Sequence, residues 1–542
     1  MTFNGPELEK TLANYAALSP VSFLKRVAHV YPDYTAVRYG SITRSWIEVS
    51  ERCKRLASAL SQRGIKRGDT VALLAPNIPE ALECALGLPL IGAVLNANNT
   101  RIDVETLSYI LMHGEARVLL VDTEYSNLAA QALSNLENDI LVVDIRDSQG
   151  PDGNAIGSIA YETLLEEGEP DFPCRLPSDE WDALSLNYTS GTTGRPKGVV
   201  YSHRGAWTNS VNNTITWGMP HHPVYLWTLP MFHCNGWCFP WTITLLGGTH
   251  VFLRNITADK IYAAFANEAV THLCGAPIIM SVISDALETD KREFNQPIRM
   301  MTAAAPPPPS VIRKMEKIGI SVTHVYGLTE VYGPAAVCAE KASWEALSDT
   351  EKYQKKARQG VTYELQEDMA VVNSETCEQV PFDGKTIGEI VFRGNITMKG
   401  YLKAPEATNE AFRNGWFWTG DLAVVHPDGY AEIRDRSKDI IISGGENISS
   451  IVVENALNSH PSVAIAAVVA KKHNKWGEVP SAFIELKPNC DRPSAETLIA
   501  HCRKTLAGFQ VPKHISFGTL PKTSTGKVQK NILREKVGKI KT

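Results

Sequence analysis

Strand-like and helix-like segments alternate along most of this chain, and the alternation limits the folds open to it. Residues 70–74 and 116–121 are short apolar runs that are typical of buried strands. Residues 46–63 instead repeat apolar side chains at helical spacing, with Val49 and Cys53 on one face. A strand–helix–strand order is typical of a largely parallel sheet covered by helices. The sequence therefore predicts an α/β fold.

A second helix is expected from Ile78 to Leu86, because the segment NIPEA carries several helix-start signals. Asn77 can cap this helix, and Pro79 is tolerated in a first turn. Glu80 stands at the capping-box position. We expect Asn77 to act as the cap.

The length and the composition of the chain predict two domains. A chain of 542 residues is too long for one ordinary hydrophobic core. The composition changes near residue 436, and a glycine loop at residues 443–447 is followed by a short α/β pattern. We expect a large N-terminal domain of packed β-sheets with covering helices at residues 1–437. A small, mobile C-terminal α/β domain is expected at residues 438–542.

Charge and the terminal sequences narrow the partners and the compartment. The formal net charge of −5 argues against nucleic-acid binding. The most apolar run, residues 84–95, is only about a dozen residues long, too short to span a bilayer. The first residues lack a signal-peptide pattern, and the chain ends without a peroxisomal Ser-Lys-Leu address. We expect a cytoplasmic protein with no stable membrane anchor, and a homodimer is a candidate assembly.

Residues 186–199, LNYTSGTTGRPKGV, combine hydroxyls, glycines and a lysine between two apolar runs. Successive N–H groups and hydroxyls beside a cation suit a polyphosphate. The spacing differs from the GxxxxGK[ST] loop, because glycine follows Lys197. A flexible surface turn is the alternative, but the flanking strand-like runs favour phosphate binding. The predicted phosphate-binding residues are Thr189, Ser190, Gly191, Thr192, Thr193, Gly194 and Lys197.

Two later blocks carry side chains that suit nucleotide chemistry. In YGLTE, Tyr326 offers an aromatic ring that can stack on a base, Thr329 offers a hydroxyl that can bind a phosphate, and Glu330 offers an oxygen ligand for Mg²⁺. The same Thr–Glu pair can also begin a helix, and both roles can hold at once. In WTGD, Asp421 presents two acceptors after a glycine, although an ordinary turn is the alternative.

The segment YTSGTTGRPKGV resembles the signature phosphate loop of adenylate-forming enzymes. This superfamily contains acyl- and aryl-CoA synthetases, firefly luciferase and peptide-synthetase adenylation domains. Further blocks follow in the family order as far as Lys527: PMFHCNGW, AAAP, YGLTE, WTGD, DRSKD and PKTSTGK. The resemblance implies an enzyme that activates a carboxylic acid with ATP.

The resemblance implies an acyl-binding site. His233 would orient the acyl group and Trp237 would wall the acyl pocket, whereas a histidine taken alone is more often a core or surface group. The segment AAAP at residues 303–306 departs from the usual glycine-glycine-alanine-proline, and its added methyl groups would narrow the site. No carboxylate occurs in residues 230–241, which disfavours an amino-acid substrate. The predicted substrate residues are His233, Trp237, Ala304, Gly327 and Leu328.

The resemblance also implies a nucleotide site and a catalytic group. Asp421 would grip the ribose hydroxyls with help from Arg436, and Lys527 would stabilise negative charge on the transferring phosphoryl group. A solvated side chain is the alternative for a lysine so near a C-terminus. The predicted catalytic residues are Lys527, Glu330, His233 and Thr329, and Glu330 is the predicted metal ligand. The remaining predicted nucleotide-binding residues are Ala304, Ala305, Pro306, Tyr326, Gly327, Asp421 and Arg436.

Lys438 stands where the family carries a hinge residue, so the resemblance implies a rotating small domain. Such a hinge lets one site serve two reactions in turn. Rotation would bring a thiol-binding surface to the site. The alternatives are that residues 444–446 form an ordinary glycine hairpin and that Trp476 is only a packing residue. The predicted CoA contacts are Gly444, Gly445, Glu446, Trp476, Phe509 and Lys513.

These expectations describe an ATP-dependent carboxylate–CoA ligase that uses ATP, Mg²⁺ and coenzyme A. The segments HCNGW, TAAAPPP and RQGVTYELQEDMAVVN are similar to medium-chain acyl-CoA synthetases of the 3-methylmercaptopropionate–CoA ligase type. A short- or medium-chain acid is expected, with 3-methylmercaptopropionate as a candidate. An aryl acid such as benzoate or a cinnamate is the alternative, since Trp237 suits either.

Two other classes of protein stay open at this point. A luciferase-like oxygenase would share the adenylation blocks, and the CoA-like segment around Trp476 argues against it. A catalytically inactive nucleotide-binding module would be expected to lose Lys527 or Glu330, and both are present.

Overall fold

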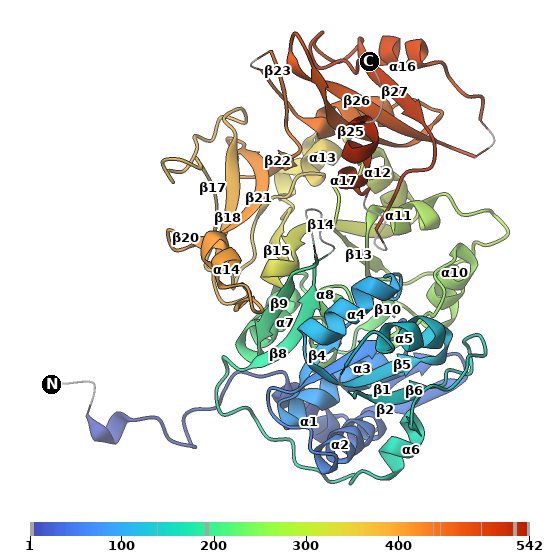
Figure 1. Ribbon diagram of the computed structural model, residues 1–542, viewed down its shortest axis with the longest axis vertical. Helices are drawn as coiled ribbons and strands as arrows, with labels where there is room; N and C mark the ends of the chain where they lie inside the picture. Colours follow the sequence, from blue (N-terminus) through green and yellow to red (C-terminus); the bar gives the residue numbers. More distant parts are fainter. Residues whose placement is uncertain are drawn as a thin grey trace.

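The computed structural model describes residues 5–137, 139–189, 195–436, 438–444, 446–488, 490–523 and 528–538. These residues form a mixed α/β fold of packed sheets with covering helices, which confirms the predicted fold class (Figure 1). The described part of the chain has no helix both long and apolar enough to cross a membrane.

Two long sheets make up the larger part of the molecule. The first sheet runs in the order β16 (Val361–Thr362), β15 (Gly333–Val337), β14 (Ile320–Leu328), β13 (Ile298–Thr302), β12 (His272–Gly275), β10 (Val224–Trp227), β11 (Thr249–Phe252), β1 (Thr35–Tyr39), β2 (Ile42–Ser45). The second runs in the order β19 (Gly400–Tyr401), β9 (Gly198–Ser202), β8 (Ala183–Tyr188), β4 (Val94–Ala97), β3 (Thr70–Leu74), β5 (Ala116–Asp122), β6 (Leu141–Ile145), β7 (Ile159–Ala160). Their central strands pair in parallel, as the alternating pattern predicts.

Two smaller sheets follow in the second half of the chain. The third sheet contains β17 (Asp368–Val372), β18 (Gly388–Arg393), β21 (Trp416–Val425) and β20 (Phe412–Arg413), with β22 (Ala431–Arg436) paired to β21. The fourth contains β24 (Glu446–Ile448), β23 (Ile441–Ser443), β26 (Gly477–Leu486) and β25 (Val463–His473), with β27 (His514–Phe517) paired to β26. Figure 1 shows the fourth sheet at the end of the molecule farthest from β1 and β2.

The helices cover the faces of these sheets. The α-helices are α1 (Val21–Val30), α2 (Trp46–Gln62), α3 (Pro79–Gly87), α4 (Val104–His113), α5 (Ser126–Leu133), α6 (Tyr161–Glu166), α7 (His203–Thr216), α8 (Cys234–Trp237), α9 (Phe239–Leu245), α10 (Ala258–Asn267), α11 (Pro277–Ser284), α12 (Pro309–Lys317), α13 (Asp349–Lys356), α14 (Pro405–Ala411), α15 (Ser450–Asn458), α16 (Ala495–Cys502) and α17 (Lys530–Gly538). Short 3₁₀ turns are η1 (Pro6–Leu8), η2 (Leu88–Ile91), η3 (Thr123–Tyr125), η4 (Thr329–Val331) and η5 (Ala342–Ala346).

Helix α2 matches its prediction because its signals are local. It begins after Ser45, whose side chain accepts from the Glu48 backbone N–H while the Glu48 carboxylate accepts from the Ser45 backbone N–H. This reciprocal pair satisfies two backbone donors at the start of the helix. The apolar face expected at Val49 and Cys53 is fully buried.

The expected cap at Asn77 is wrong. Helix α3 begins after Ile78, and no side chain caps it. Asn77 Nδ2 instead donates to the carbonyl oxygens of Trp227 and Leu229, and Asn77 Oδ1 accepts from the Met231 backbone N–H. These backbone groups are buried and need a hydrogen-bond partner, and the Asn77 amide supplies one to each, so it does not cap the helix.

The fourth sheet encloses a hydrophobic cluster of its own, which contains Ile441, Val453 and Val468. Residues beyond 437 also bond back to β22: Asp435 Oδ2 accepts from the Ser450 backbone N–H, and Ser449 Oγ donates to the Arg434 carbonyl oxygen. The predicted boundary between the two domains, between residues 437 and 438, stays a proposal.

Candidate functional site

The predicted phosphate loop joins β8 to β9, two neighbouring antiparallel strands. The neck of the loop is closed by two bonds between Thr189 and Lys197. The Thr189 backbone N–H donates to the Lys197 carbonyl oxygen at 3.0 Å, and the Lys197 backbone N–H donates to Thr189 Oγ1 at 3.2 Å. The strand–loop–strand setting expected from the sequence is therefore present. Ser190, Gly191, Thr192, Thr193 and Gly194 lie outside the described residues.

Helix α4 contacts both flanks of this loop, which the sequence did not indicate. His113 Nδ1 lies 2.8 Å from the hydroxyl oxygen of Tyr188, the last residue of β8. On the other flank, the Arg195 guanidinium carbon lies 5.3 Å from the ring centroid of Tyr109. A cation over an aromatic face is attracted to it. Side chains of one helix thus hold the entry and the exit of the loop.

The Thr–Glu turn η4 lies next to this loop and is held from three sides. Tyr201 donates its hydroxyl to the Thr329 carbonyl oxygen at 2.7 Å, and Cys234 Sγ lies 3.7 Å from Thr329 Oγ1. Tyr401 donates its hydroxyl to Glu330 Oε1 at 2.8 Å. Burial raises the pKa of Glu330, while the Tyr401 hydrogen bond and the charge of Lys197 act in the opposite direction. Glu330 is therefore a partly buried carboxylate with a cation near it.

The donor set around Glu330 fits a magnesium ion that is shared with phosphates. In the described residues no cluster of three or more His, Cys, Asp or Glu side chains forms a metal cage. Mg²⁺ in nucleotide sites is usually held by one or two carboxylates together with phosphate oxygens and waters. A single carboxylate at Glu330 beside a phosphate loop matches that pattern.

Asp421 and Arg436 form the predicted ribose-binding corner. They lie opposite each other on β21 and β22, and Arg436 Nε is 3.1 Å from Asp421 Oδ1. Tyr326 donates its hydroxyl to Asp421 Oδ2 at 2.7 Å. Burial raises the pKa of the Tyr326 hydroxyl, and the neighbouring Asp421 charge raises it further. The structure therefore brings Tyr326, Asp421 and Arg436 into one bonded group.

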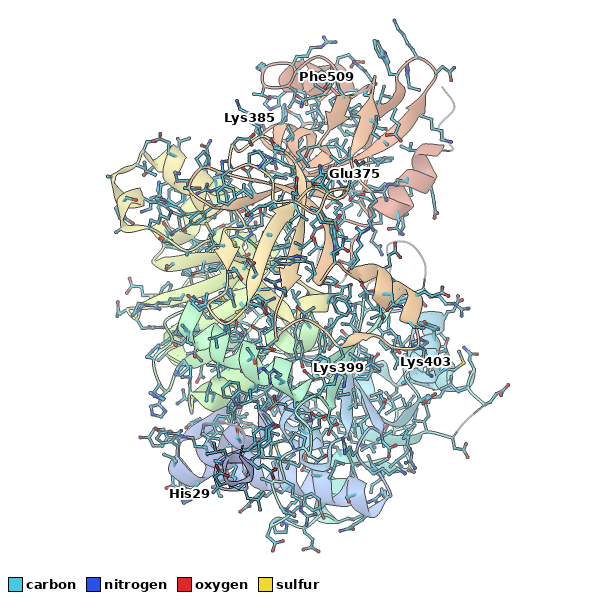
Figure 2. The ribbon with its side chains drawn as sticks, turned by 90° about the vertical axis from the view of Figure 1, so that its left-hand side faces the viewer. His29, Glu375, Lys385, Lys399, Lys403 and Phe509 are labelled. Carbon is cyan, nitrogen blue, oxygen red and sulfur yellow. The ribbon has the colours of Figure 1, made fainter. Side chains whose placement is uncertain are left out.

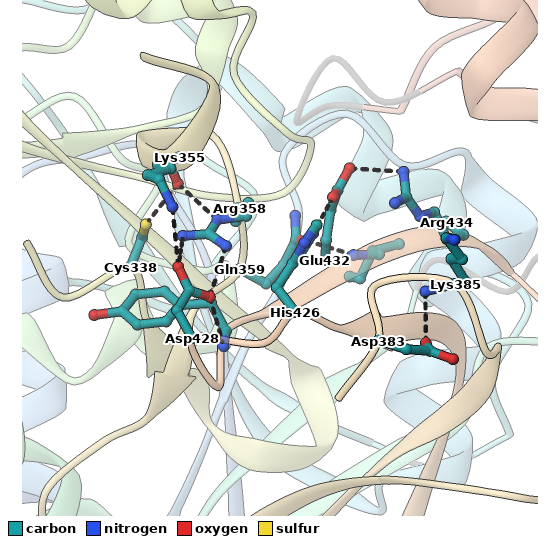
Figure 3. Close-up of polar contacts among 12 residues, drawn as sticks. Cys338, Lys355, Arg358, Gln359, Asp383, Lys385, His426, Asp428, Glu432 and Arg434 are labelled. Carbon is teal, nitrogen blue, oxygen red and sulfur yellow. Dashed lines mark hydrogen bonds and ion pairs between the residues drawn. The ribbon is translucent and has the colours of Figure 1, made fainter. Parts of the chain in front are cut away.

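The far end of the same hairpin is anchored by ion pairs (Figure 3). Asp428 accepts from Arg358 Nη1 and Nη2 at 2.9 Å each, and Lys355 Nζ lies 3.1 Å from Asp428 Oδ2. These cations hold the pKa of Asp428 well below its ordinary value, against the effect of burial. The Arg358 guanidinium carbon also lies 4.8 Å from the Tyr430 ring centroid. The hairpin that carries Asp421 and Arg436 is thus fixed at its tip.

The segment after His233 forms a left-handed turn. The backbone φ angles of residues 234–238 are 44°, 42°, 53°, 55° and 65°. Left-handed helical geometry costs about 1–2 kcal/mol for each residue that carries a Cβ. Asn213 Nδ2 donates to the Trp237 carbonyl oxygen at 2.9 Å, and Ser185 Oγ donates to Asn235 Oδ1 at 2.6 Å. Buried polar side chains therefore hold this strained segment.

Trp237 is only 3% exposed, so its ring is part of the protein interior in this structure. It packs against Gly333, where a Cβ would come within 3.1 Å of Trp237 Cα. His233 is partly buried at the start of the turn, and its backbone N–H donates to the Pro230 carbonyl oxygen. The acyl-pocket roles of Trp237 and His233 stay predictions.

The backbone is strained at Ala304 and leaves no room for a side chain at Gly327 in β14. Ala304 has a φ of 78°, a region that glycine enters freely and alanine does not. Ala304, Ala305 and Pro306 are exposed. A Cβ at Gly327 would lie 1.7 Å from the Gly333 carbonyl oxygen, so no larger residue fits there. Leu328, the last residue of β14, is partly buried and packs against the main core.

Lys438, the predicted hinge residue, follows Arg436 of the predicted ribose-binding corner by two positions in the chain. Burial lowers the pKa of Lys438 to about 8, and the charges of Arg436 and Arg534 lower it as well. The charge of Asp421 acts to raise the pKa of Lys438, so Lys438 lies within electrostatic reach of the predicted ribose-binding residues. Lys527 lies outside the described residues.

The predicted CoA contacts lie on the fourth sheet and its loops. A Cβ at Gly444 would meet the Trp476 ring at 2.9 Å, and the Gly444 backbone N–H donates to the Trp476 carbonyl oxygen at 2.8 Å. Trp476, Phe509 and Glu446 are exposed, while Lys513 Nζ donates to the Gly508 carbonyl oxygen at 3.4 Å. Figure 2 shows Phe509 at the top of the molecule, and Lys399 and Lys403, which flank β19, in the lower half. The structure does not bring the Phe509 loop to β19. Gly445 lies outside the described residues.

Comparison with known proteins identifies the family of the chain. The AMP-binding enzyme family matches residues 24–402, and the AMP-binding enzyme C-terminal domain matches residues 452–527. A peroxisomal acetate/butyrate–CoA ligase of Arabidopsis thaliana is 47% identical over 98% of this chain and 96% of its own length. A peroxisomal trans-cinnamate:CoA ligase of Petunia hybrida is 46% identical over 98% of this chain and 95% of its own.

A solved structure of ATP-bound MatB from Rhodopseudomonas palustris superposes with a TM-score of 0.81 at 25% identity, covering 96% of this chain and 99% of that one. The family match covers more than half of the chain. This chain therefore belongs to the AMP-binding enzyme family, within the adenylate-forming superfamily that its motifs resemble.

Proposed function

We propose that this enzyme is an ATP-dependent carboxylate–CoA ligase that works through an acyl-adenylate. The observation that carries the proposal is that Glu330, a partly buried carboxylate, lies within reach of the positive charges of both Lys197 and Arg436, which oppose the rise in its pKa that burial causes. A cation beside a phosphate loop and a carboxylate for a metal are what a nucleoside triphosphate requires. The match to the AMP-binding family supports the enzyme class, an AMP-forming acid–thiol ligase.

In the first half-reaction a carboxylate oxygen of the acid attacks the α-phosphorus of ATP, and the bond to pyrophosphate breaks. Lys197 and Thr329 would bind phosphate oxygens, Asp421 would hold the ribose and His233 would orient the attacking carboxylate. Such a reaction is accelerated mainly by alignment and by stabilising charge in a preorganised site. Glu330 would hold Mg²⁺, which when bound supplies positive charge to the phosphates.

In the second half-reaction the CoA sulfur attacks the acyl carbon, the bond to AMP breaks and the thiol proton is released. We propose that residues 438–542 rotate about Lys438 between the two steps. Trp476 and Phe509 are exposed, and Phe509 lies away from β19, which supports a thiol-binding surface that must move to reach the adenylate. Lys527 would act in the first step and leave the site in the second.

The proposed substrate is a short- or medium-chain aliphatic acid, and 3-methylmercaptopropionate stays a candidate. The relative named as an acetate/butyrate–CoA ligase supports the aliphatic class. The alanines at residues 303–305 add methyl groups beside the predicted acyl site, which favours a slim acid. An aryl acid is the second candidate, because another relative of nearly equal identity is named as a trans-cinnamate:CoA ligase.

A panel of acids tests the proposal. The purified enzyme is given ATP, Mg²⁺ and CoA with acetate, butyrate, hexanoate, 3-methylmercaptopropionate, benzoate or trans-cinnamate, and each thioester is quantified by mass. Thioester and AMP in equal amounts, with the highest kcat/KM for an aliphatic acid, are expected. The highest value for benzoate or cinnamate would move the enzyme to the aryl class. ATP binding without thioester from any acid would count against the ligase assignment.

Compartment and assembly stay predictions. Four of the relatives are named as peroxisomal, whereas the sequence predicts a cytoplasmic protein. Localisation of a tagged chain in cells decides between the two. Light scattering of the purified protein tests the predicted homodimer.

A further inference from the structure

Tyr401 contacts two of the charged residues that are predicted to bind the nucleotide. Its hydroxyl donates to Glu330 Oε1 at 2.8 Å, and Lys197 Nζ lies 4.4 Å from the centroid of its ring. One face of the phenol therefore holds the cation of the phosphate loop, and its polar end holds the predicted metal ligand. Neither the motifs nor the family resemblance assigned Tyr401 a role.

Main-chain pairing fixes Tyr401 in this position. Strand β19 runs antiparallel to β9, with Tyr401 opposite Val199, and the Leu402 backbone N–H donates to the Gly198 carbonyl oxygen at 2.7 Å. Gly198 follows Lys197 directly, so the pairing sets the ring beside the Lys197 side chain. The Tyr401 backbone N–H also donates to Thr408 Oγ1 at 3.0 Å, on the first turns of α14.

The Glu330 backbone is held by the same segment. The Met398 backbone N–H donates to the Glu330 carbonyl oxygen at 2.8 Å. Residues 398–402 thus bond the main chain of Glu330, the carboxylate of Glu330 and the strand that leaves the phosphate loop. A side chain that bridges two ligand-binding groups can fix their separation, which is how residues behind a metal ligand tune its affinity.

We propose that Tyr401 is a positioning residue that sets the Glu330 carboxylate and the Lys197 ammonium at the spacing needed for a metal–triphosphate. The proposal rests on the proposed function, because it takes Glu330 and Lys197 to be ligands of Mg²⁺ and ATP. The hydroxyl orients the carboxylate toward the metal, and the ring orients the ammonium toward the phosphates. These two effects belong to different atoms of one side chain, so two substitutions separate them.

The substitution Tyr401→Phe removes the hydroxyl and keeps the ring, whereas Tyr401→Leu removes both. Isothermal titration measures ATP binding in EDTA, and a Mg²⁺ titration at saturating ATP measures the apparent metal affinity. For Tyr401→Phe we expect unchanged ATP affinity in EDTA and an apparent Mg²⁺ affinity weaker by about 10-fold, the low end for a residue behind a metal ligand. For Tyr401→Leu we expect the same loss and, in addition, ATP binding in EDTA weaker by about 3-fold, since a cation–π contact is lost.

The pair Tyr353 and Glu316 provides a matched control. Tyr353 of α13 donates its hydroxyl to Glu316 Oε2 at 3.0 Å, a similar tyrosine–carboxylate bond outside the predicted site. Tyr353→Phe should leave both the ATP affinity in EDTA and the Mg²⁺ affinity at the wild-type values. Thermal unfolding of all variants separates a loss of stability from a loss of positioning.

The outcomes distinguish this proposal from the proposed function. If wild-type protein binds ATP more tightly with Mg²⁺ and Tyr401→Phe shows the same gain, the role of Tyr401 is overturned while the ligase assignment stands. A lower unfolding temperature with unchanged Mg²⁺ affinity also overturns it, because the residue is then structural. Wild-type protein that binds no ATP under either condition overturns both.

Discussion

Asp421 and Arg436 lie directly opposite each other on two antiparallel strands, with Arg436 Nε 3.1 Å from Asp421 Oδ1. The pair joins the predicted ribose contact to the predicted hinge, because Lys438 follows Arg436 by two positions in the chain. Rotation about Lys438 would therefore act next to the nucleotide. Tyr326 bonds the other oxygen of the same carboxylate, so Asp421 has a fixed orientation before any ligand binds.

Substitution of Asp421 by Asn tests the ribose role. The amide keeps the size of the side chain and loses the charge and one acceptor. We expect the KM for ATP to rise by about 10- to 100-fold, because hydrogen bonds to a charged group contribute about 1.5–3 kcal/mol. The KM for the acid should change little. Steady-state kinetics with each substrate varied in turn checks this, and a KM for ATP equal to that of the wild type would remove Asp421 from the nucleotide site.

Substitution of Gly327 by Ala tests the close approach of β14 and β15. A Cβ at this position would lie 1.7 Å from the Gly333 carbonyl oxygen, which is backbone and has little freedom to move. We expect a loss of about 1–3 kcal/mol of stability, the usual cost of a methyl group that the surrounding atoms cannot accommodate. Gly508→Ala is the control, because a Cβ there meets nothing within 4 Å. Equal unfolding temperatures for the two variants would contradict the tight strand approach.

Local signals allowed much of the fold to be predicted, and long-range contacts account for what was missed. Helix α2 follows from its apolar periodicity and its capping box, both contained within the segment itself. Asn77 shows the limit, since its amide bonds the Trp227 carbonyl oxygen 150 positions away and leaves the helix uncapped. The Tyr401–Glu330 bond likewise joins residues 71 positions apart. No local pattern shows which of two distant segments will become neighbours.

The features of the candidate site also fall into those that a local motif predicts and those that depend on distant residues. Motif blocks located Lys197, Glu330, Asp421 and Arg436, and the structure places these residues close enough for their charges to interact. The left-handed turn at residues 234–238 gave no comparable signal, because only one of its five residues is glycine. Its geometry depends on side chains such as Asn213, which reach it from another helix.

Buried histidines predict a loss of stability in acid, and His324 is the clearest case. Burial lowers the pKa of His324 from 6.5 to about 4, and its Nδ1 donates to the Arg358 carbonyl oxygen at 2.8 Å. Between these two pKa values the unfolded chain binds more protons than the folded chain, so stability falls as the pH falls through this window. The shift corresponds to about 3 kcal/mol when complete.

The variant His324→Gln isolates this contribution. Its free energy of unfolding in urea should fall less than that of the wild type between pH 7 and pH 4.5, by about 2 kcal/mol. The comparison uses the change with pH in each protein, so a constant loss from repacking cancels. Parallel pH profiles for the two proteins would show that His324 does not titrate as described.

Lys527 and Lys438 should separate the two half-reactions. Lys527→Ala removes the charge proposed for the first step, and we expect a loss of adenylate formation of about 100-fold or more, with far less effect on thioester formation from supplied acyl-AMP. Lys438→Pro should do the reverse, because a rigid φ restricts the proposed hinge. Single-turnover assays of each step check both variants. Equal losses in the two steps would contradict the roles given to these lysines.

The most direct test of the central claim is acid-dependent pyrophosphate release by the wild-type enzyme, measured with and without CoA. If the chain forms an acyl-adenylate and then a thioester, release without CoA should stop after about one equivalent per active site, since the adenylate stays bound. Addition of CoA should restore steady turnover with AMP and thioester in equal amounts. Steady release that ignores CoA, or no release with any acid while ATP still binds, would contradict the assignment of this protein as an acyl-CoA ligase.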